Sequence, residues 1–84
     1  KAAERESSAR FNATLAAGYF ILAIRSVGLA AGPMLGWDKA GMDATFFPDG
    51  RWKSILVINA GKPGPDAWKE RLHRLAFDEA VKIV

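Results

Sequence analysis

The sequence predicts an α+β fold, and three features of the chain lead to this prediction. A long apolar segment at helical spacing comes first, a short helix with a capping residue follows, and a segment rich in β-branched residues comes after a turn. Half of the 84 residues are hydrophobic and the net charge is only +3, which is a globular composition. A chain of this length buries only about 60% of its unfolded surface, so a small core is expected.

The first expected element is a helix from about Arg5 to Leu29. Its apolar residues cover most of the circumference, and one stripe contains Phe11, Leu15, Tyr19 and Leu22. A helix of this kind is expected to be buried on more than one side. Gly28 and Gly32 are stop signals and Pro33 prevents helical continuation, so a loop is expected from about residue 30.

Residues 28–38, GLAAGPMLGWD, are therefore predicted to form an apolar loop bracketed by glycines. Asp38 is expected to cap a short helix that runs to about Phe46, because its carboxylate can accept a hydrogen bond from the first turn. Residues 48–50, Pro-Asp-Gly, fit positions i+1 to i+3 of a type I turn.

Residues 51–60, RWKSILVINA, are predicted to form a strand, and the continuous apolar run at 55–58 suggests that both faces are covered. This is the one strand that the sequence predicts firmly. A single strand cannot form a sheet, so its partners are expected to lie outside these residues. The chain is then expected to be part of a larger chain, an obligate oligomer, or both.

The C-terminal part of the chain gives weaker signals. GKPGPD is expected to form a turn, and Pro65 fits the first position of a short helix that runs to about Arg71. The last ten residues, LAFDEAVKIV, fit a helix or a strand equally well.

Composition and spacing exclude several kinds of function. The absence of cysteine excludes disulfides and thiolate metal sites, and a single histidine excludes a multi-histidine metal site within the chain. The basic residues are scattered except for one cluster, so nucleic-acid binding is not expected. That cluster consists of Lys69, Arg71, His73 and Arg74.

The apolar run at 13–24 is shorter than the roughly 20 residues that span a bilayer, and no signal peptide opens the chain. A cytoplasmic protein without a membrane segment is therefore expected.

Three segments, GLAAGPMLGWDKAGMDATFF, WKSILVINAG and RLHRLAFDEA, resemble the C-terminal half of nitroreductase-family flavoproteins, in particular the malonic semialdehyde reductase-like branch. The resemblance covers nearly the whole chain. It implies that residues 1–84 are the C-terminal segment of a single nitroreductase-like domain whose N-terminal half is absent. The expected parts are a long buried helix, a short helix, one central-sheet strand and an extended C-terminal tail, in a homodimer with FMN at its interface.

The same resemblance implies roles for six residues in binding FMN. Pro33 and Met34 would lie against a face of the flavin ring, and the backbone N–H groups of Leu35 and Gly36 would approach its N5 region. Arg74 and Arg71 would bind the phosphate, with the choice between them left open. No catalytic side chain and no metal are implied. The residues alone favour a helix cap followed by a hydrophobic turn for the loop, and a solvated face for the arginines.

The resemblance implies an FMN-dependent oxidoreductase that uses NAD(P)H as hydride donor. The electron acceptor would be a nitro compound, a quinone, an enone or a small aldehyde such as malonic semialdehyde. The 84 residues alone are expected to be inactive. An alternative is a non-enzymatic interaction module that docks through its apolar helix, and a weaker one is an anion or nucleic-acid binder that uses the basic cluster. Arg25 is expected to face a carboxylate or solvent.

Overall fold

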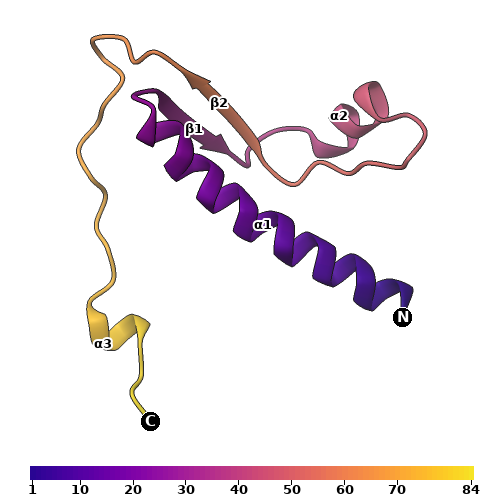
Figure 1. Cartoon of the computed structure of the whole chain (residues 1–84), viewed down its shortest axis with the longest axis horizontal. Coiled ribbons are helices and arrows are strands. Elements are labelled where there is room, and N and C mark those ends of the chain that lie inside the picture. Colours follow the sequence, from indigo (N-terminus) through magenta and orange to yellow (C-terminus); the bar gives the residue numbers. More distant parts are fainter.

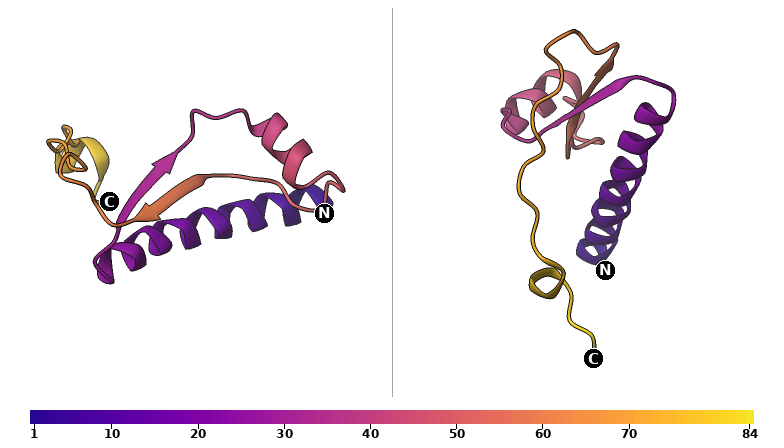
Figure 2. Two further views of the ribbon diagram at one scale, coloured as in Figure 1. Left: turned by 90° about the horizontal axis from the view of Figure 1, so that it is seen from above. Right: turned by 90° about the vertical axis from the view of Figure 1, so that its left-hand side faces the viewer.

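The computed structural model describes residues 1–84 and shows a long helix beside a two-stranded sheet (Figure 1). Its elements in order are α1 (Ala2–Ser26), β1 (Ala30–Met34), α2 (Lys39–Phe46), β2 (Val57–Gly61) and α3 (Phe77–Ala80). In two further views α1 runs alongside the hairpin of β1 and β2, while the chain after β2 leaves this body (Figure 2). The predicted α+β class is consistent with this arrangement.

Helix α1 ends at Ser26 rather than at the predicted Leu29, and Gly28 is the reason. The Gly28 N–H donates to the Arg25 carbonyl over 3.0 Å, and the Leu29 N–H donates to the Ile24 carbonyl over 3.2 Å. These two bonds form a Schellman motif, in which the residue after the C-cap adopts a left-handed conformation. Gly28 has φ +83°, which glycine adopts without steric cost. The predicted stop signal at Gly28 is confirmed.

Strand β1 corrects the prediction of a loop from residue 30 onward. It pairs antiparallel with β2, from Ala30 opposite Gly61 to Met34 opposite Val57. The partner of the predicted strand therefore lies inside the chain, contrary to expectation. Glycine and proline at 32 and 33 are loop signals locally, but the distant strand provides the pairing that overrides them. A Cβ at Gly32 would overlap the Asn59 side-chain oxygen on the facing strand, so a residue without a side chain fits here.

Strand β2 is shorter than predicted, because only residues 57–61 face β1. The residues before it are held by α2 instead of by a strand. The Ser54 backbone N–H donates to Asp43 Oδ1 over 3.0 Å, and the Ser54 hydroxyl donates to the same oxygen. These two hydrogen bonds link α2 to the segment that leads into β2.

The predictions for α2 and for the turn after it are confirmed. Asp38 Oδ1 accepts a hydrogen bond from the Gly41 N–H over 3.0 Å, as an N-cap carboxylate does. The Gly50 N–H donates to the Phe47 carbonyl over 3.0 Å, which closes the turn at Pro48 and Asp49. Both features depend on residues that lie within four positions of one another.

The segment after β2, residues 62–84, is here called the C-terminal segment, and the helix predicted from Pro65 to Arg71 does not form in it. A single turn closes where the Ala67 N–H donates to the Gly64 carbonyl over 3.2 Å. Nucleation of so short a helix is costly, and no packed apolar face supports it here. The ambiguous end of the chain contains only the four-residue α3, and Glu79 Oε1 accepts from the N–H of its N-cap, Ala76, over 3.2 Å.

The chain covers little of its own apolar surface. Ile24, 6% exposed, is its one buried residue. Five large apolar residues of α1 are more than half exposed, namely Phe11, Leu15, Tyr19, Phe20 and Leu22. The radius of gyration is 16.6 Å, against about 12 Å for a compact domain of this length. This chain therefore does not bury the long helix as predicted.

None of its helices combines the length and the apolar character needed to cross a bilayer.

We expect Ser54→Ala to raise the pKa of Asp43 toward its ordinary value. The Ser54 hydroxyl is the main cause that lowers this pKa, and the Ser54 backbone N–H comes next. A carboxyl with a lowered folded-state pKa stabilises the fold above its unfolded-state pKa, and this stabilisation is lost as the pH falls through the folded-state pKa. Stability of the variant should therefore depend less on pH below about pH 4.

Carboxyl ¹³C NMR titration of the complete protein would measure the pKa of Asp43, and urea unfolding at several acidic pH values would measure the stability. Thr45→Val is a matched control, because the Thr45 hydroxyl donates to the Gly41 carbonyl and to no carboxylate. An unchanged pKa of Asp43 in Ser54→Ala would contradict the prediction.

Candidate functional site

Four of the six predicted site residues lie at one end of the hairpin. Pro33 and Met34 are the last residues of β1, and Leu35 and Gly36 begin the connection to α2. The Leu35 side chain is 76% exposed and that of Met34 is 41% exposed. This end of the hairpin therefore offers an apolar surface that no other part of the chain covers.

The turn that follows β1 is fixed by Trp37, whose Nε1–H donates to the Met34 carbonyl over 2.8 Å. The backbone N–H groups of Leu35 and Gly36 donate to no acceptor in the chain. A Cβ placed on Gly36 would meet no atom within 4 Å, so the space beside its backbone is open. The turn thus has a defined shape and two unpaired backbone donors, which need a partner if the turn becomes buried.

These features fit the ring of a flavin. The isoalloxazine is a flat apolar system with polar edge atoms, so its binding site needs apolar walls and a few well-placed hydrogen-bond donors. Pro33 and Met34 can provide a wall, while Leu35 and Gly36 can provide donors. The residues present are therefore compatible with the cofactor that the resemblance implies.

Arg71 and Arg74, the other two predicted site residues, lie in the C-terminal segment. Neither forms an ion pair with a carboxylate of the chain. Arg74 Nη1 donates to the Leu72 carbonyl over 2.9 Å and to the His73 carbonyl over 3.4 Å, which leaves its other guanidinium nitrogens free. A planar guanidinium with free donors suits phosphate oxygens, so both residues fit the predicted role.

The two parts of the predicted site are not in contact within the chain. The register places Met34 and Val57 at one end of the hairpin and Ala30 and Gly61 at the other. The C-terminal segment leaves from the Gly61 end, away from the turn at 34–37 (Figure 1).

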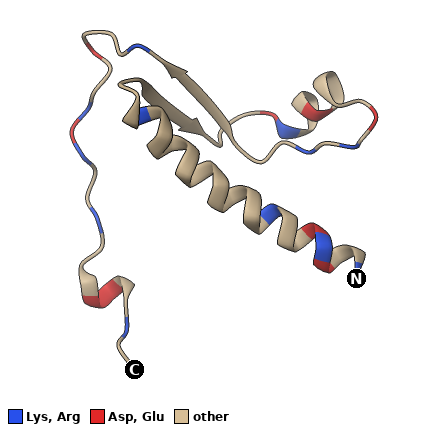
Figure 3. Ribbon diagram, in the orientation of Figure 1, with Lys and Arg blue, Asp and Glu red and all other residues tan.

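The charged residues lie outside the two strands and outside the middle of α1, and these uncharged parts form the centre of the structure (Figure 3). Residues 11–24 of α1 carry no Lys, Arg, Asp or Glu, and neither strand carries one. Arg25, in the last turn of α1, is the cation that borders this centre at the C-terminal end of the helix. An isolated cation beside apolar surface is a position where an aromatic partner is favourable.

Of the two expectations for Arg25, a carboxylate or solvent, the structure shows no carboxylate partner, and the residue is exposed. Its guanidinium carbon lies 4.5 Å from the centroid of the Trp68 ring, and its Nη1 donates to the Leu29 carbonyl over 2.9 Å. Trp68 belongs to the C-terminal segment, so this contact joins parts of the chain that are far apart in sequence. No local pattern in the sequence indicates such a pair.

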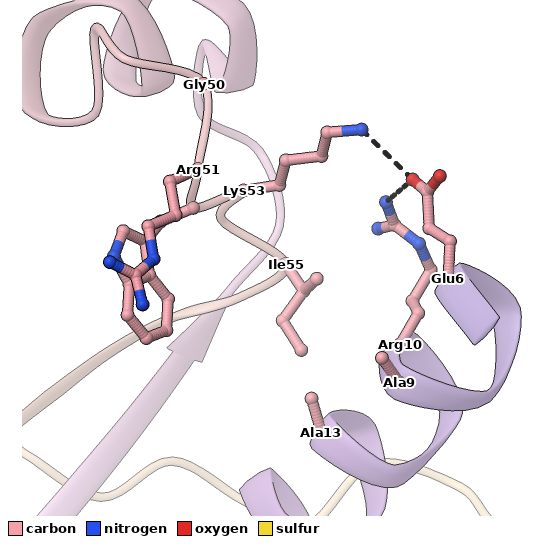
Figure 4. A pocket seen from close by; sticks show the side chains of 9 residues that line it. Glu6, Ala9, Arg10, Ala13, Gly50, Arg51, Lys53 and Ile55 are labelled. Carbon is pink, nitrogen blue, oxygen red and sulfur yellow. Dashed lines mark hydrogen bonds and ion pairs between the residues drawn. The ribbon is translucent and has the colours of Figure 1, made fainter. Parts of the chain in front are cut away.

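A pocket of about 470 Å³ lies between α1 and the chain before β2, and no predicted site residue lines it (Figure 4). Ala9, Ala13, Trp52 and Ile55 form its apolar part. At its rim Glu6 accepts a hydrogen bond from Lys53 Nζ over 3.1 Å, and this bond is the main cause that lowers the pKa of Glu6. Arg10 lies 3.8 Å from the same carboxylate oxygen. These exposed pairs contribute little stability.

Comparison with curated proteins shows relatives with one shared name, "Putative NADH dehydrogenase/NAD(P)H nitroreductase". The chain is 56% identical over 80 residues to such a protein of Streptomyces coelicolor, which covers 94% of the chain and 39% of the relative. It is 51% identical over 80 residues to one of Streptomyces griseus, covering 95% of the chain and 40% of the relative. A protein of Rhodopseudomonas palustris is 46% identical over 77 residues, covering 92% and 39%.

The chain thus spans about two fifths of the length of these relatives, at 39% and 40%. No protein-family model matches it. The shared name describes NAD(P)H oxidoreductases of the nitroreductase type, so it supports the resemblance to nitroreductases. It names neither FMN nor the malonic semialdehyde reductase-like branch, and both remain predictions.

We expect Trp37→Phe to loosen the turn after β1, because the variant keeps an aromatic ring but lacks the N–H that donates to Met34. A hydrogen bond of this kind contributes about 0.5–1.5 kcal/mol, so its loss should make the backbone at Leu35 and Gly36 more mobile and lower their NMR order parameters. Relaxation of ¹⁵N measured on the flavin-free complete protein would test this. Trp52→Phe is the control, since the Trp52 indole N–H has no hydrogen-bond partner in the chain. Equal order parameters in wild type and Trp37→Phe would show that the indole does not fix the turn.

Proposed function

We propose that this chain forms part of an FMN-dependent NAD(P)H oxidoreductase of the nitroreductase family. The observation that carries the proposal is the turn at 34–37, with its open glycine and two unpaired backbone donors at an apolar end of the hairpin. The identity of 56% to a relative named as an NAD(P)H nitroreductase, over 94% of the chain, supports it.

Each candidate residue has a defined task in this proposal. Bound FMN would supply hydride transfer between NAD(P)H and an electron acceptor. Pro33 and Met34 cover an apolar face of the ring and exclude water from it. The N–H groups of Leu35 and Gly36 donate to the polar edge, which stabilises negative charge there. Arg71 and Arg74 bind the phosphate with charge-assisted hydrogen bonds and so fix the orientation of the cofactor.

The electron acceptor in this proposal is a nitro compound, a quinone, an enone or a small aldehyde, with malonic semialdehyde as an example of the last. The proposed assembly is a cytoplasmic homodimer in which further protein covers the exposed apolar side chains of α1. These side chains are the feature that supports it, because contiguous exposed apolar surface marks sites of protein contact.

The same exposed face of α1 favours a second candidate, a non-enzymatic interaction module that docks through this helix. An absorbance spectrum of the purified complete protein separates the two candidates. A flavin spectrum, with bleaching on addition of NADH or NADPH, supports the oxidoreductase. A protein without flavin that gains none on incubation with FMN would favour the interaction module.

We expect Gly36→Val to weaken FMN binding or slow reduction by NAD(P)H, by about tenfold if one hydrogen bond is lost. The new side chain would occupy the open space beside the Gly36 backbone, where the cofactor must approach. Leu35→Ala is the matched comparison and should have a smaller effect, because Leu35 is proposed to act through its main chain. Fluorescence titration with FMN and stopped-flow reduction would measure both effects. Equal affinity and equal rates in a folded Gly36→Val protein would remove the turn from the site.

We expect Arg74→Ala to raise the FMN dissociation constant about ten- to a hundredfold, the loss of charge-assisted hydrogen bonds worth about 1.5–3 kcal/mol. Riboflavin lacks the phosphate, so its affinity should stay nearly unchanged. Arg71→Ala should behave in the same way only if Arg71 shares the contact. Lys69→Ala, in the same basic cluster, is the control. Equal weakening of FMN and riboflavin by Arg74→Ala would mean that Arg74 acts through the fold and not on the phosphate.

A further inference from the structure

We infer that Arg25 and Trp68 form a clamp that positions the part of the C-terminal segment carrying Arg71 and Arg74. Arg25 and Trp68 are thus positioning residues, which act through the two arginines. The role in phosphate binding rests on the proposed function, whereas the clamp itself rests on geometry alone.

The Arg25 guanidinium makes two contacts, a hydrogen bond to Leu29 and a cation–π contact with Trp68. Its Nη1 donates to the Leu29 carbonyl over 2.9 Å, within the chain that joins α1 to β1. Its central carbon lies 4.5 Å from the centroid of the Trp68 ring, within the range of a cation–π interaction. Because the guanidinium is planar, a hydrogen bond along its edge leaves its face available for the indole. The hydrogen bond to Leu29 therefore orients the surface on which Trp68 stacks.

This contact is the specific side-chain link between the C-terminal segment and the rest of the chain. All hydrogen bonds of residues 65–84 are formed with residues of the C-terminal segment itself. No ion pair joins this segment to the helices or to the sheet that precede it. Among the contacts within this chain, the turn that follows Gly61 is the other feature that sets its direction.

The surroundings of Trp68 place the clamp at the Gly61 end of the hairpin. A pocket of about 380 Å³ lies there, and Trp68 and mostly small residues of both strands line it. Ala30, Ala31 and Gly32 contribute from β1, and Asn59, Ala60 and Gly61 from β2. Small residues leave room for an indole beside the strand ends, which explains how the large Trp68 ring reaches Arg25.

Arg71 and Arg74 follow Trp68 by only a few residues, and an extended chain advances about 3.3 Å per residue. A fixed Trp68 therefore restricts both guanidinium groups to a limited volume. A released segment must lose more conformational freedom when it binds a phosphate, and this lowers affinity. The clamp thus favours binding of a ligand with a phosphate and has no effect on a ligand without one.

The test uses the complete protein with two pairs of variants. Arg25→Gln keeps a donor for Leu29 but removes the charge, whereas Arg25→Lys keeps the charge. Trp68→Leu removes the ring, whereas Trp68→Phe keeps an aromatic face. Trp52→Leu is the matched control, because Arg51 lies farther from that ring, at 5.8 Å, and the C-terminal segment is not involved.

The first measurement is made without flavin, by NMR of the arginine side chains. Guanidinium protons above an indole are shifted upfield by the ring current, and we expect this shift for Arg25 in wild type and its loss in Trp68→Leu. Absence of the shift in wild type would overturn the clamp, whether or not the protein binds FMN.

The second measurement compares FMN with riboflavin. Arg25→Gln and Trp68→Leu should each weaken FMN about two- to fivefold, the range of an exposed cation–π contact, and leave riboflavin unchanged. Arg25→Lys and Trp68→Phe should recover most of the loss, and the double variant should be no worse than either single variant. Additive losses, or equal losses for both flavins, would overturn the positioning role. If the shift is present but wild type binds no FMN, the proposed function and the positioning role fail while the clamp stands.

Discussion

The antiparallel pairing of β1 with β2 is the interaction on which the other parts of this structure depend. Ala30 lies opposite Gly61 at one end and Met34 opposite Val57 at the other. The first end receives the chain from α1 and releases the C-terminal segment, and the second end leads into the turn with the unpaired donors. A shift of the register by one residue would turn each side chain of the shifted strand to the opposite face of the sheet. It would also displace both ends of the hairpin.

The features that were predicted correctly are those that depend on near neighbours in sequence. The Asp38 cap and the turn at Pro48 each need a few adjacent residues, as does the end of α1 at Gly28. Their physical basis is a preferred backbone conformation or a single local hydrogen bond, which residue types reveal directly. The loop predicted at 28–38 is correct only at its two ends, because residues 30–34 in its middle form β1.

The features that were missed join residues far apart in sequence. Strand β1 contains Gly32 and Pro33, which argue for a loop until a distant partner supplies hydrogen bonds. The contact of Arg25 with Trp68 and the ion pair of Glu6 with Lys53 leave no periodicity or spacing that could be recognised. For the candidate site, residue types indicate which groups can bind a flavin. Whether their backbone donors are unpaired follows only from the folded path of the chain.

The hydrogen bonds between Asp43 and Ser54 have a consequence for the entropy of the chain. They join residues eleven positions apart, inside the long connection between the two strands. Once formed, they roughly halve the length of free chain that must be closed when β1 meets β2. Each halving of a flexible loop reduces the entropic cost of its closure by about 0.6 kcal/mol. A carboxylate on α2 thus favours the formation of a sheet to which it makes no contact.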